Sequence, residues 1–400
     1  MAIKNKSPKL KLINFIKAID LTKVDEVYIS NGVIIPKKEE INQNNFTLVD
    51  CKDCIIAPGF IDPQLNGFKD CDFWQLPSFE KIDDLRLKLA LSGVTAFCPT
   101  IITNEKEKII QSIDHINSYL KQSRSDAGSK ILGIHIEGIF ITKFGVHEEK
   151  YIQKELTIKN LEPFIKENVV IFTLAPELDK SGEAIKFLQK NNILVSIGHS
   201  NASYREGEST INKFGLHCVT HMFNSLKGID GFSHRESNST NLKLLELKLK
   251  NDNPIDPDKD GIILSILKDK NTCCMVIADG LHVNKEVLKI LYRNKGKELF
   301  SLVTDMVSIE FFNLAKKHGA LGGGQTPLEK CIFNLVNWGI CNIEDALICA
   351  SRPIANQLRI AKDMGLGQLS FGKEANITLW DTKKNSVKGT IIGENIFLNY

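Results

Sequence analysis

Short apolar runs alternate with segments of helical spacing through the middle of the chain. Eight runs have the length and composition of β-strands, and they cover residues 55–62, 94–97, 131–136, 169–175, 193–198, 217–220, 273–278 and 299–304. Helical spacing lies between most of them, as in 81–91, 106–120 and 285–292, and two further helices are expected at 328–338 and 343–350. Eight strand–helix repeats predict an α/β fold, a TIM-type (β/α)8 barrel, whose functional residues lie at the carboxyl ends of the strands.

The two ends of the chain follow a different pattern. Residues 8–56 and 375–397 consist of short β-type segments joined by turns such as Asn31-Gly32. We therefore expect residues 1–57 and 365–400 to form a small β-sandwich domain, and residues 58–364 to form the barrel. A polar, turn-rich stretch at 237–261 breaks the repeat and is interpreted as a surface insertion.

Two of the predicted strands end directly on histidines. The strand at 193–198 precedes His199, and the strand at 217–220 precedes His221. Between them, residues 204–214 have helical spacing and end at Gly215, a common residue after a helix. A parallel β-α-β unit places both strand ends on one side of the sheet, so the two imidazoles should meet. They could form the beginning of a metal site, or a hydrogen-bonded pair at a polar barrel rim.

A third candidate ligand favours the metal site. Glu137 ends the predicted third strand, and one carboxylate with two imidazoles is a known catalytic zinc set that leaves a position for water. A bound divalent ion lowers the pKa of that water toward ~7. Asp305 follows the eighth strand and could accept the water's proton and return it to a leaving group. Taken alone, Asp305 could equally be a rim carboxylate or a helix cap.

Composition narrows the class of protein. The 400 residues carry a net charge of +3 without a basic stripe, so nucleic acid is not an expected partner. No apolar run approaches ~18 residues and the first residues lack a signal-peptide core, so we expect no membrane span and a cytoplasmic location. Ten scattered cysteines fit a reducing compartment. Cys51 and Cys54 form a CxxC without a second pair, which we interpret as incidental.

Several segments together resemble one known family, the N-acetylglucosamine-6-phosphate deacetylases of the amidohydrolase superfamily. They follow the family's order over nearly the whole chain: PGFIDPQLNG (58–67), GIHIEGIF (133–140), GVHEEKYI (145–152), SIGHSNASY (196–204), THMFNSL (220–226), ADGLHV (278–283), LVTD (302–305) and GALGGG (319–324). The resemblance implies a hydrolase that converts N-acetyl-D-glucosamine 6-phosphate to D-glucosamine 6-phosphate and acetate in amino-sugar catabolism. It also implies that Glu137, His199 and His221 hold a divalent metal, and that Asp305 is the catalytic proton donor and acceptor.

The resemblance further implies a set of substrate-binding residues. These are Val146, His147, Asn224, Ser225, Arg235, His282, Leu321, Gly322 and Gly323. Arg235 suits phosphate because guanidinium forms bidentate hydrogen bonds to oxyanions, although it could also be a solvated loop charge. In the family such an arginine crosses a dimer interface, so we expect a homodimer. His217 matches no family motif and is expected to be structural.

Three departures from the family pattern bear on the function. Most amidohydrolases carry His-x-His after the first strand, whereas this chain has Gln64-Leu65-Asn66, so we expect one metal ion per chain, zinc. Ile139 replaces the usual proline after Glu137-Gly138, and the segment 306–318 is short and bulky. The alternatives are a cyclic-amide hydrolase of the same superfamily, which would require His-x-His and a bridging lysine, or a catalytically impaired or non-enzymatic protein of this fold.

Overall fold

The computed structural model describes residues 9–37, 45–122, 128–236 and 238–399. Residues 1–8 and 38–44 of the predicted N-terminal segment, Ser237 at the start of the predicted insertion, and Tyr400 lie outside these ranges. No helix among the described residues is long and apolar enough to cross a membrane.

The predicted strands of the middle of the chain form one main sheet, which is curled and mostly parallel. The order is β16-β15-β14-β13-β12-β11-β9-β7-β17, with β10 beside β9 and β8 beside β7. The strands are β7 (Phe60–Lys69), β8 (Cys71–Asp72), β9 (Val94–Ile101), β10 (Lys130–Ile131), β11 (Ile134–Glu137), β12 (Val169–Leu174), β13 (Leu194–Ile197), β14 (Cys218–Val219), β15 (Cys273–Val276), β16 (Phe300–Leu302) and β17 (Met306–Ser308). Because the two outermost strands, β16 and β17, are consecutive in the chain, the sheet turns back on itself.

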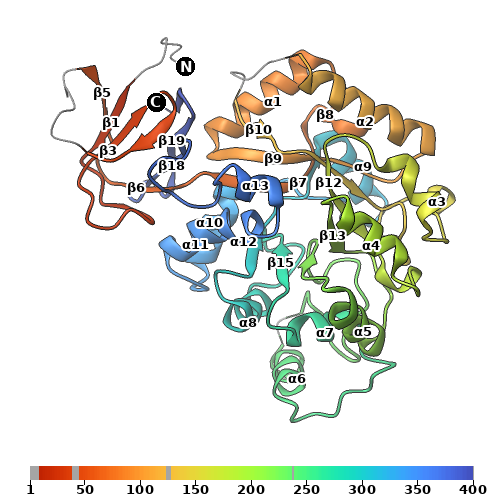
Figure 1. The fold of residues 1–400 in the computed structure, drawn as a ribbon. Helices are drawn as coiled ribbons and strands as arrows, with labels where there is room; N and C mark the ends of the chain where they lie inside the picture. Colours follow the sequence, from red (N-terminus) through yellow and green to blue (C-terminus); the bar gives the residue numbers. More distant parts are fainter. Residues whose placement is uncertain (1–8, 38–44, 123–127, 237, 400) are drawn as a thin grey trace.

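Helices surround the outside of this sheet (Figure 1). They are α1 (Phe79–Leu91), α2 (Lys106–Leu120), α3 (Ile158–Leu161), α4 (Glu183–Lys190), α5 (Tyr204–Phe214), α6 (Ser239–Lys250), α7 (Ile262–Lys268), α8 (Lys285–Lys295), α9 (Ile309–Lys317), α10 (Leu328–Asn337), α11 (Ile343–Cys349), α12 (Arg352–Ala355) and α13 (Arg359–Asp363). Within the described ranges, 3-10 helices lie at η2 (Phe73–Gln75), η4 (Glu149–Tyr151), η5 (Glu162–Phe164) and η6 (Pro176–Leu178). The helix predicted at 204–214 is confirmed: Ser203 and Glu206 form a capping box, and Gly215 ends the helix at φ 63°.

Two predicted strands are broken by glycines. The run 55–62 divides at Gly59 into β6 (Cys54–Pro58), which pairs with β18, and β7 of the main sheet. A Cβ at Gly59 would lie 2.2 Å from the Thr95 side chain, so only glycine fits where the chain passes between the two sheets. The run 131–136 divides at Gly133, whose φ of 152° interrupts the strand. Apolar pattern alone does not reveal such breaks.

Both ends of the chain contribute to two smaller sheets. One has the order β4-β3-β1-β5 and the other β2-β6-β18-β19-β20. Their strands are β1 (Leu10–Ile13), β2 (Lys17–Ala18), β3 (Val27–Ser30), β4 (Val33–Ile35), β5 (Thr47–Asp50), β18 (Asn376–Asp381), β19 (Ser386–Ile392) and β20 (Asn395–Leu398), together with β6. Leu12, Ile29, Ile56, Ile377 and Leu379 belong to one buried cluster, so the two sheets share a core. They stand together at one side of the molecule (Figure 1).

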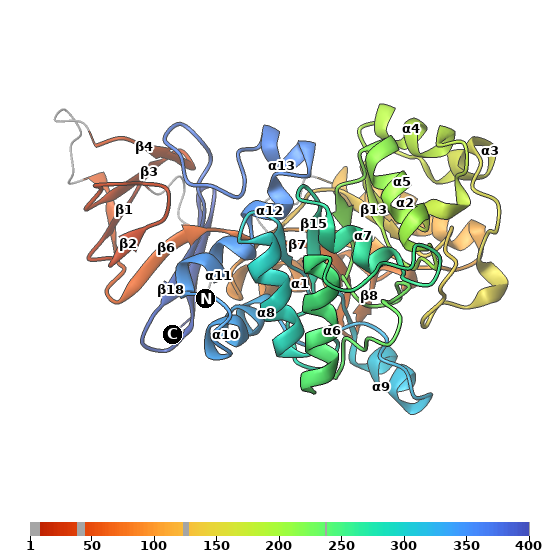
Figure 2. The same ribbon diagram turned by 90° about the horizontal axis from the view of Figure 1, so that it is seen from below.

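Two segments that the sequence left without a strand or helix assignment are helical. Within 237–261, α6 buries Leu245 completely, and Lys248 forms a buried ion pair with Asp260 at 2.8 Å. Within 306–318, β17 pairs with β7 and leads into α9, which projects from the body of the molecule (Figure 2).

Candidate active site and metal centre

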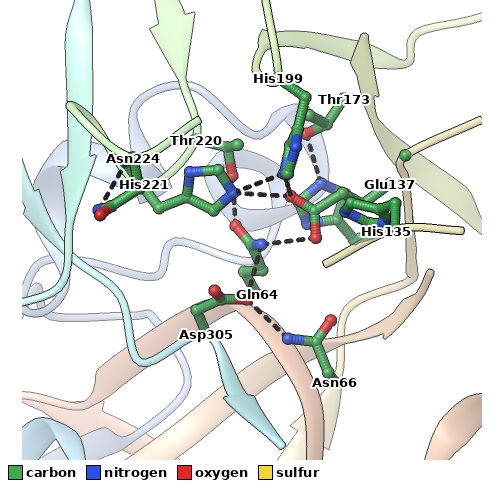
Figure 3. Close-up of polar contacts among 12 residues, drawn as sticks. Gln64, Asn66, His135, Glu137, Thr173, His199, Thr220, His221, Asn224 and Asp305 are labelled. Atoms are coloured by element: carbon green, nitrogen blue, oxygen red, sulfur yellow. Dashed lines mark hydrogen bonds and ion pairs between the residues drawn. The ribbon is translucent and has the colours of Figure 1, made fainter. Parts of the chain in front are cut away.

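Three side chains from neighbouring strand ends converge on one point. Glu137 ends β11, His199 follows β13, and His221 follows β14. His221 Nε2 lies 3.0 Å from Glu137 Oε1 and 3.2 Å from His199 Nε2, and His199 Nε2 lies 3.5 Å from Glu137 Oε1. All three residues are buried, and Figure 3 shows them pointing toward one another. The predicted meeting of the two histidines is therefore confirmed.

The backbone is strained at three residues of the site that follow strands. His199, His221 and Asp305 have φ values of 51°, 24° and 49°, in the left-handed region that residues other than glycine seldom occupy. Such conformations cost roughly 1–3 kcal/mol each and persist where the surrounding structure enforces them, often at functional sites. At each of these positions the left-handed conformation changes the direction of the backbone just after the strand. The side chain can therefore point toward the centre of the sheet's carboxyl end.

A network of hydrogen bonds fixes the orientation of His199. Its Nδ1 lies 2.9 Å from Lys143 O, and the Lys143 N–H in turn donates to His199 O at 2.9 Å. Glu177 secures both neighbouring segments: Oε1 accepts from Asn201 N at 2.8 Å and from the Thr142 hydroxyl, and Oε2 accepts from Ser200 Oγ at 2.7 Å. Because a carbonyl can only accept, Nδ1 carries the proton and Nε2 presents a lone pair to the cluster.

The donor set fits a divalent cation. Burial would raise the pKa of Glu137, but the adjacent imidazoles of His199 and His221 hold it well below its usual value. Burial would likewise lower the pKa of His221, but the hydrogen bond and negative charge of Glu137 raise it to about 9. The cluster therefore attracts positive charge, and its ligand atoms lie within 4.8 Å of one another. One carboxylate and two imidazoles match the protein ligands of an open divalent site.

Gln64 occupies the position between the two acidic groups of the site. Its Nε2 donates to Glu137 Oε2 at 2.8 Å and to Asp305 Oδ1 at 2.9 Å, while its Oε1 accepts from the Thr220 hydroxyl (Figure 3). Asn66 Nδ2 donates to the same Asp305 oxygen at 2.6 Å. Burial, assisted by the charge of Glu137, raises the pKa of Asp305 to about 6. The two amides thus act as hydrogen-bond donors to carboxylates.

One cavity of about 300 Å³ unites the cluster with the predicted substrate-binding residues. Among the residues predicted from the sequence, its lining includes Glu137, Val146, His147, His199, His221, Asn224, Ser225, Arg235, His282, Asp305, Leu321 and Gly323. Gly322 is the exception: it is buried and is not part of the lining, and a Cβ there would lie 2.7 Å from Ala315 Cβ. The half-buried imidazole of His147 is held by Thr103, whose Oγ1 lies 2.7 Å from Nδ1.

Basic side chains gather on one side of this cavity. We call Lys143, His234, Arg235 and His282 the basic group, and all four line the cavity. Lys143 Nζ donates to Leu226 O at 2.6 Å, and among the described residues neither Lys143 nor Arg235 forms an ion pair. His282 is oriented by Asp279, which accepts from Nδ1 at 2.7 Å. A half-buried ammonium without a carboxylate partner favours an anionic ligand.

Curated relatives match almost the entire chain, and they carry one name. The N-acetylglucosamine-6-phosphate deacetylase of Danio rerio is 30% identical over 409 residues, covering 93% of this chain and 93% of its own length. That of Caenorhabditis elegans is 30% identical over 427 residues, covering 97% and 95%. The chain belongs to the N-acetylglucosamine-6-phosphate deacetylase family. The resemblance noted in the sequence is thereby confirmed, although no protein-family model matches the chain.

Solved structures of deacetylases with this name share the fold. The Pasteurella multocida enzyme superposes with a TM-score of 0.79 at 23% identity, covering 98% of this chain and 100% of its own. The Mycobacterium smegmatis mutant enzyme in complex with N-acetyl-D-glucosamine-6-phosphate gives a TM-score of 0.77 at 17% identity, covering 98% and 100%. At these identities the comparison supports the fold alone.

The structure of this deacetylase-family member adds residues that the sequence patterns did not single out. Lys143 and His234 join Arg235 at the cavity, Thr103 holds His147, and Glu177 accepts hydrogen bonds from the segment that follows His199. Lys143 precedes the Gly145-Val146-His147 motif by two positions. That proximity was the one signal in the sequence for a role of Lys143 in the cavity. From sequence alone, a lysine in a loop cannot be distinguished from a charge that faces solvent.

Proposed function

We propose that this protein hydrolyses the acetamide of N-acetyl-D-glucosamine 6-phosphate in amino-sugar metabolism, releasing D-glucosamine 6-phosphate and acetate. Its membership of the deacetylase family supports this function. The decisive structural observation is that the buried Glu137–His199–His221 cluster shares one cavity with Asp305 and with the basic group. The metal-ligand set alone would fit any amidohydrolase. The basic group adds a preference for an anionic substrate.

Glu137, His199 and His221 would hold one divalent ion, which we propose to be zinc. When bound, such an ion polarises a carbonyl oxygen and lowers the pKa of water. Gln64 restrains Glu137 through Oε2, so that Oε1 stays directed at the histidines. Since Gln64 and Asn66 donate to carboxylates and offer only weak amide ligands, the site is suited to a single ion.

Asp305 is proposed to move the proton. Both amide donors reach Oδ1, so Oδ2 is the oxygen available to the reacting groups. Asp305 accepts a proton there from the attacking water and delivers it to the amide nitrogen as the C–N bond breaks. His147 lines the same cavity, and its Nδ1–H donates to Thr103 Oγ1, because the Thr103 hydroxyl itself donates to Gly138 O at 2.5 Å. The Nε2 atom of His147 is therefore an acceptor that can position a hydroxyl or N–H group of the substrate.

The basic group is proposed to bind the 6-phosphate. Arg235 supplies a planar set of donors, and Lys143 supplies an ammonium whose only hydrogen bond within the described residues is to a carbonyl. The proposal also includes a closed eight-stranded barrel at 58–364, a terminal β-sandwich domain at 1–57 and 365–400, a homodimer and a cytoplasmic location. One buried cluster draws all of its buried members from these two terminal ranges, which supports the division into domains.

The direct test is acetate release from N-acetyl-D-glucosamine 6-phosphate by purified protein of measured metal content. Asp305→Asn with the same metal content serves as the control for contaminating enzymes. We expect acetate and free amine in equal amounts, and little activity on dihydroorotate or hydantoin. Metal-replete protein that releases no acetate would contradict the proposal, and cleavage of the cyclic amides would favour the alternative hydrolase.

A further inference from the structure

The side of the cavity away from the basic group is apolar. We call this side the apolar wall, and it consists of Ile102, Val146, Val307, Phe311 and Leu321. Its most bulky member is Phe311 on α9, in the segment 306–318 that departs from the family pattern.

Phe311 is held in place from several directions. Ser308 caps α9 by accepting from Phe311 N at 3.1 Å, and Ser308 N donates to the buried Asp72 at 2.8 Å. The Phe311 ring packs edge-to-face on Trp74, with 5.2 Å between centroids and 69° between planes. A buried cap and an aromatic neighbour leave the ring few alternative positions.

The glycine-rich segment packs between this ring and the backbone of Asp305. A Cβ at Gly322 would lie 3.3 Å from Phe311 Cε1, and a Cβ at Gly323 would lie 2.6 Å from Asp305 O. These two consecutive glycines therefore lie between the ring and the backbone of Asp305. Phe311 and Asp305 also line the same cavity.

The cavity lining is contributed by different loops. In the basic group, His234, Arg235 and His282 follow β14 and β15, and Lys143 comes from the loop after β11 and reaches the β14 loop, where its Nζ donates to Leu226 O at 2.6 Å. In the apolar wall, Ile102, Val307 and Phe311 belong to the region of β9, β17 and α9, whereas Leu321 follows α9 and Val146 lies in the loop after β11. In Figure 3, Asn224 and Asn66 lie on opposite sides of the pair formed by His221 and Asp305. In glucosamine 6-phosphate the phosphate on C6 and the nitrogen on C2 project from opposite sides of the sugar ring. With phosphate at the basic group and the amide at Asp305, the acyl group extends toward the apolar wall.

We propose that Phe311, supported by Trp74, forms the end of an acyl pocket and limits the acyl group to about the size of acetyl. This inference rests on the proposed function, since it assumes that the amide is hydrolysed at Asp305. Phe311 is then a specificity-determining residue that contacts the methyl end of the substrate. An apolar pocket discriminates one methylene group by roughly 10- to 200-fold.

The test compares kcat/KM for N-acetyl, N-propionyl and N-butyryl glucosamine 6-phosphate in wild type, Phe311→Ala and Phe311→Trp. We expect Phe311→Ala to raise the butyryl-to-acetyl ratio by about tenfold or more, and Phe311→Trp to lower the propionyl-to-acetyl ratio. Each ratio is measured within one variant, so loss of folded protein does not alter it. Phe312→Ala is the matched control, because Phe312 is half-buried on α9 but is not among the residues that line the cavity.

The possible outcomes separate this inference from the proposed function. Wild type without acetate release would refute the function, whatever the variants do. Active wild type whose acyl ratios stay unchanged in both Phe311 variants would refute the acyl pocket. An equal rise in KM for all three substrates in Phe311→Ala would also refute it, since that result would place the ring against the sugar.

Discussion

The floor and the rim of the cavity are built by different means. The floor consists of Glu137, His199, His221 and Asp305, which are only 2–9% exposed and lie at strand ends. The rim includes Arg235, which is exposed, and Phe311, which stands on a projecting helix. Floor positions follow from the sheet, whereas rim positions depend on the length and shape of loops. We infer that the floor determines the reaction and that the rim determines which molecule undergoes it.

The largest effect is expected from removing a floor ligand. His221→Ala should abolish tight metal binding and reduce acetate release to background, because two ligands remain of three. Metal analysis of the wild type should find one divalent ion per chain. The matched control is His217→Ala in the same β-α-β unit, because His217 is half-exposed and lies 3.6 Å from Asp269, away from the cluster. Two tightly bound ions per wild-type chain would contradict the single-metal interpretation.

The second effect separates catalysis from metal binding within the floor. Asp305→Asn should retain the metal and the fold but lower kcat by a factor on the order of 10²–10⁴, because the amide cannot carry the proton. Circular dichroism and metal content check that only the proton step has changed. Turnover close to that of the wild type would assign proton transfer to another group.

The contrast between floor and rim also explains what could be predicted from the sequence. The meeting of His199 and His221 follows from two strands, a capped helix and the parallel geometry that joins them. The contacts of Gln64 could not be predicted, because they depend on three strand ends meeting across the sheet. The position of α9 could not be predicted either, because residues 306–318 matched no segment of the family. Whether apolar residues such as Phe311 line a cavity or pack elsewhere depends on neighbours that are distant in sequence.

A rim residue should affect the choice of substrate more than the chemistry. If Arg235 binds phosphate, Arg235→Ala should lower kcat/KM for the 6-phosphate by roughly 10- to 150-fold, equivalent to about 1.5–3 kcal/mol for a hydrogen bond to a charged group. Residual activity on unphosphorylated N-acetylglucosamine should change little. Arg205→Ala is the control, because Arg205 is an exposed arginine that pairs with Asp258. An equal loss on both substrates would indicate that Arg235 supports structure.

The smallest effect should come from the residue that connects the two regions. Glu177 touches no substrate position, but it holds Thr142 and Asn201 on either side of the contact between Lys143 O and His199 Nδ1. Glu177→Ala should therefore weaken metal binding by roughly tenfold, the lower end for a residue that supports a ligand. Competition with a chelator would measure this change, while kcat at saturating metal should stay near the wild-type value. Glu177→Gln keeps one carbonyl oxygen for Asn201 and should recover most of the affinity. If both variants bind metal as the wild type does, the backbone at His199 positions this ligand without the hydrogen bonds of Glu177. The metal affinity of the floor would then not depend on that network.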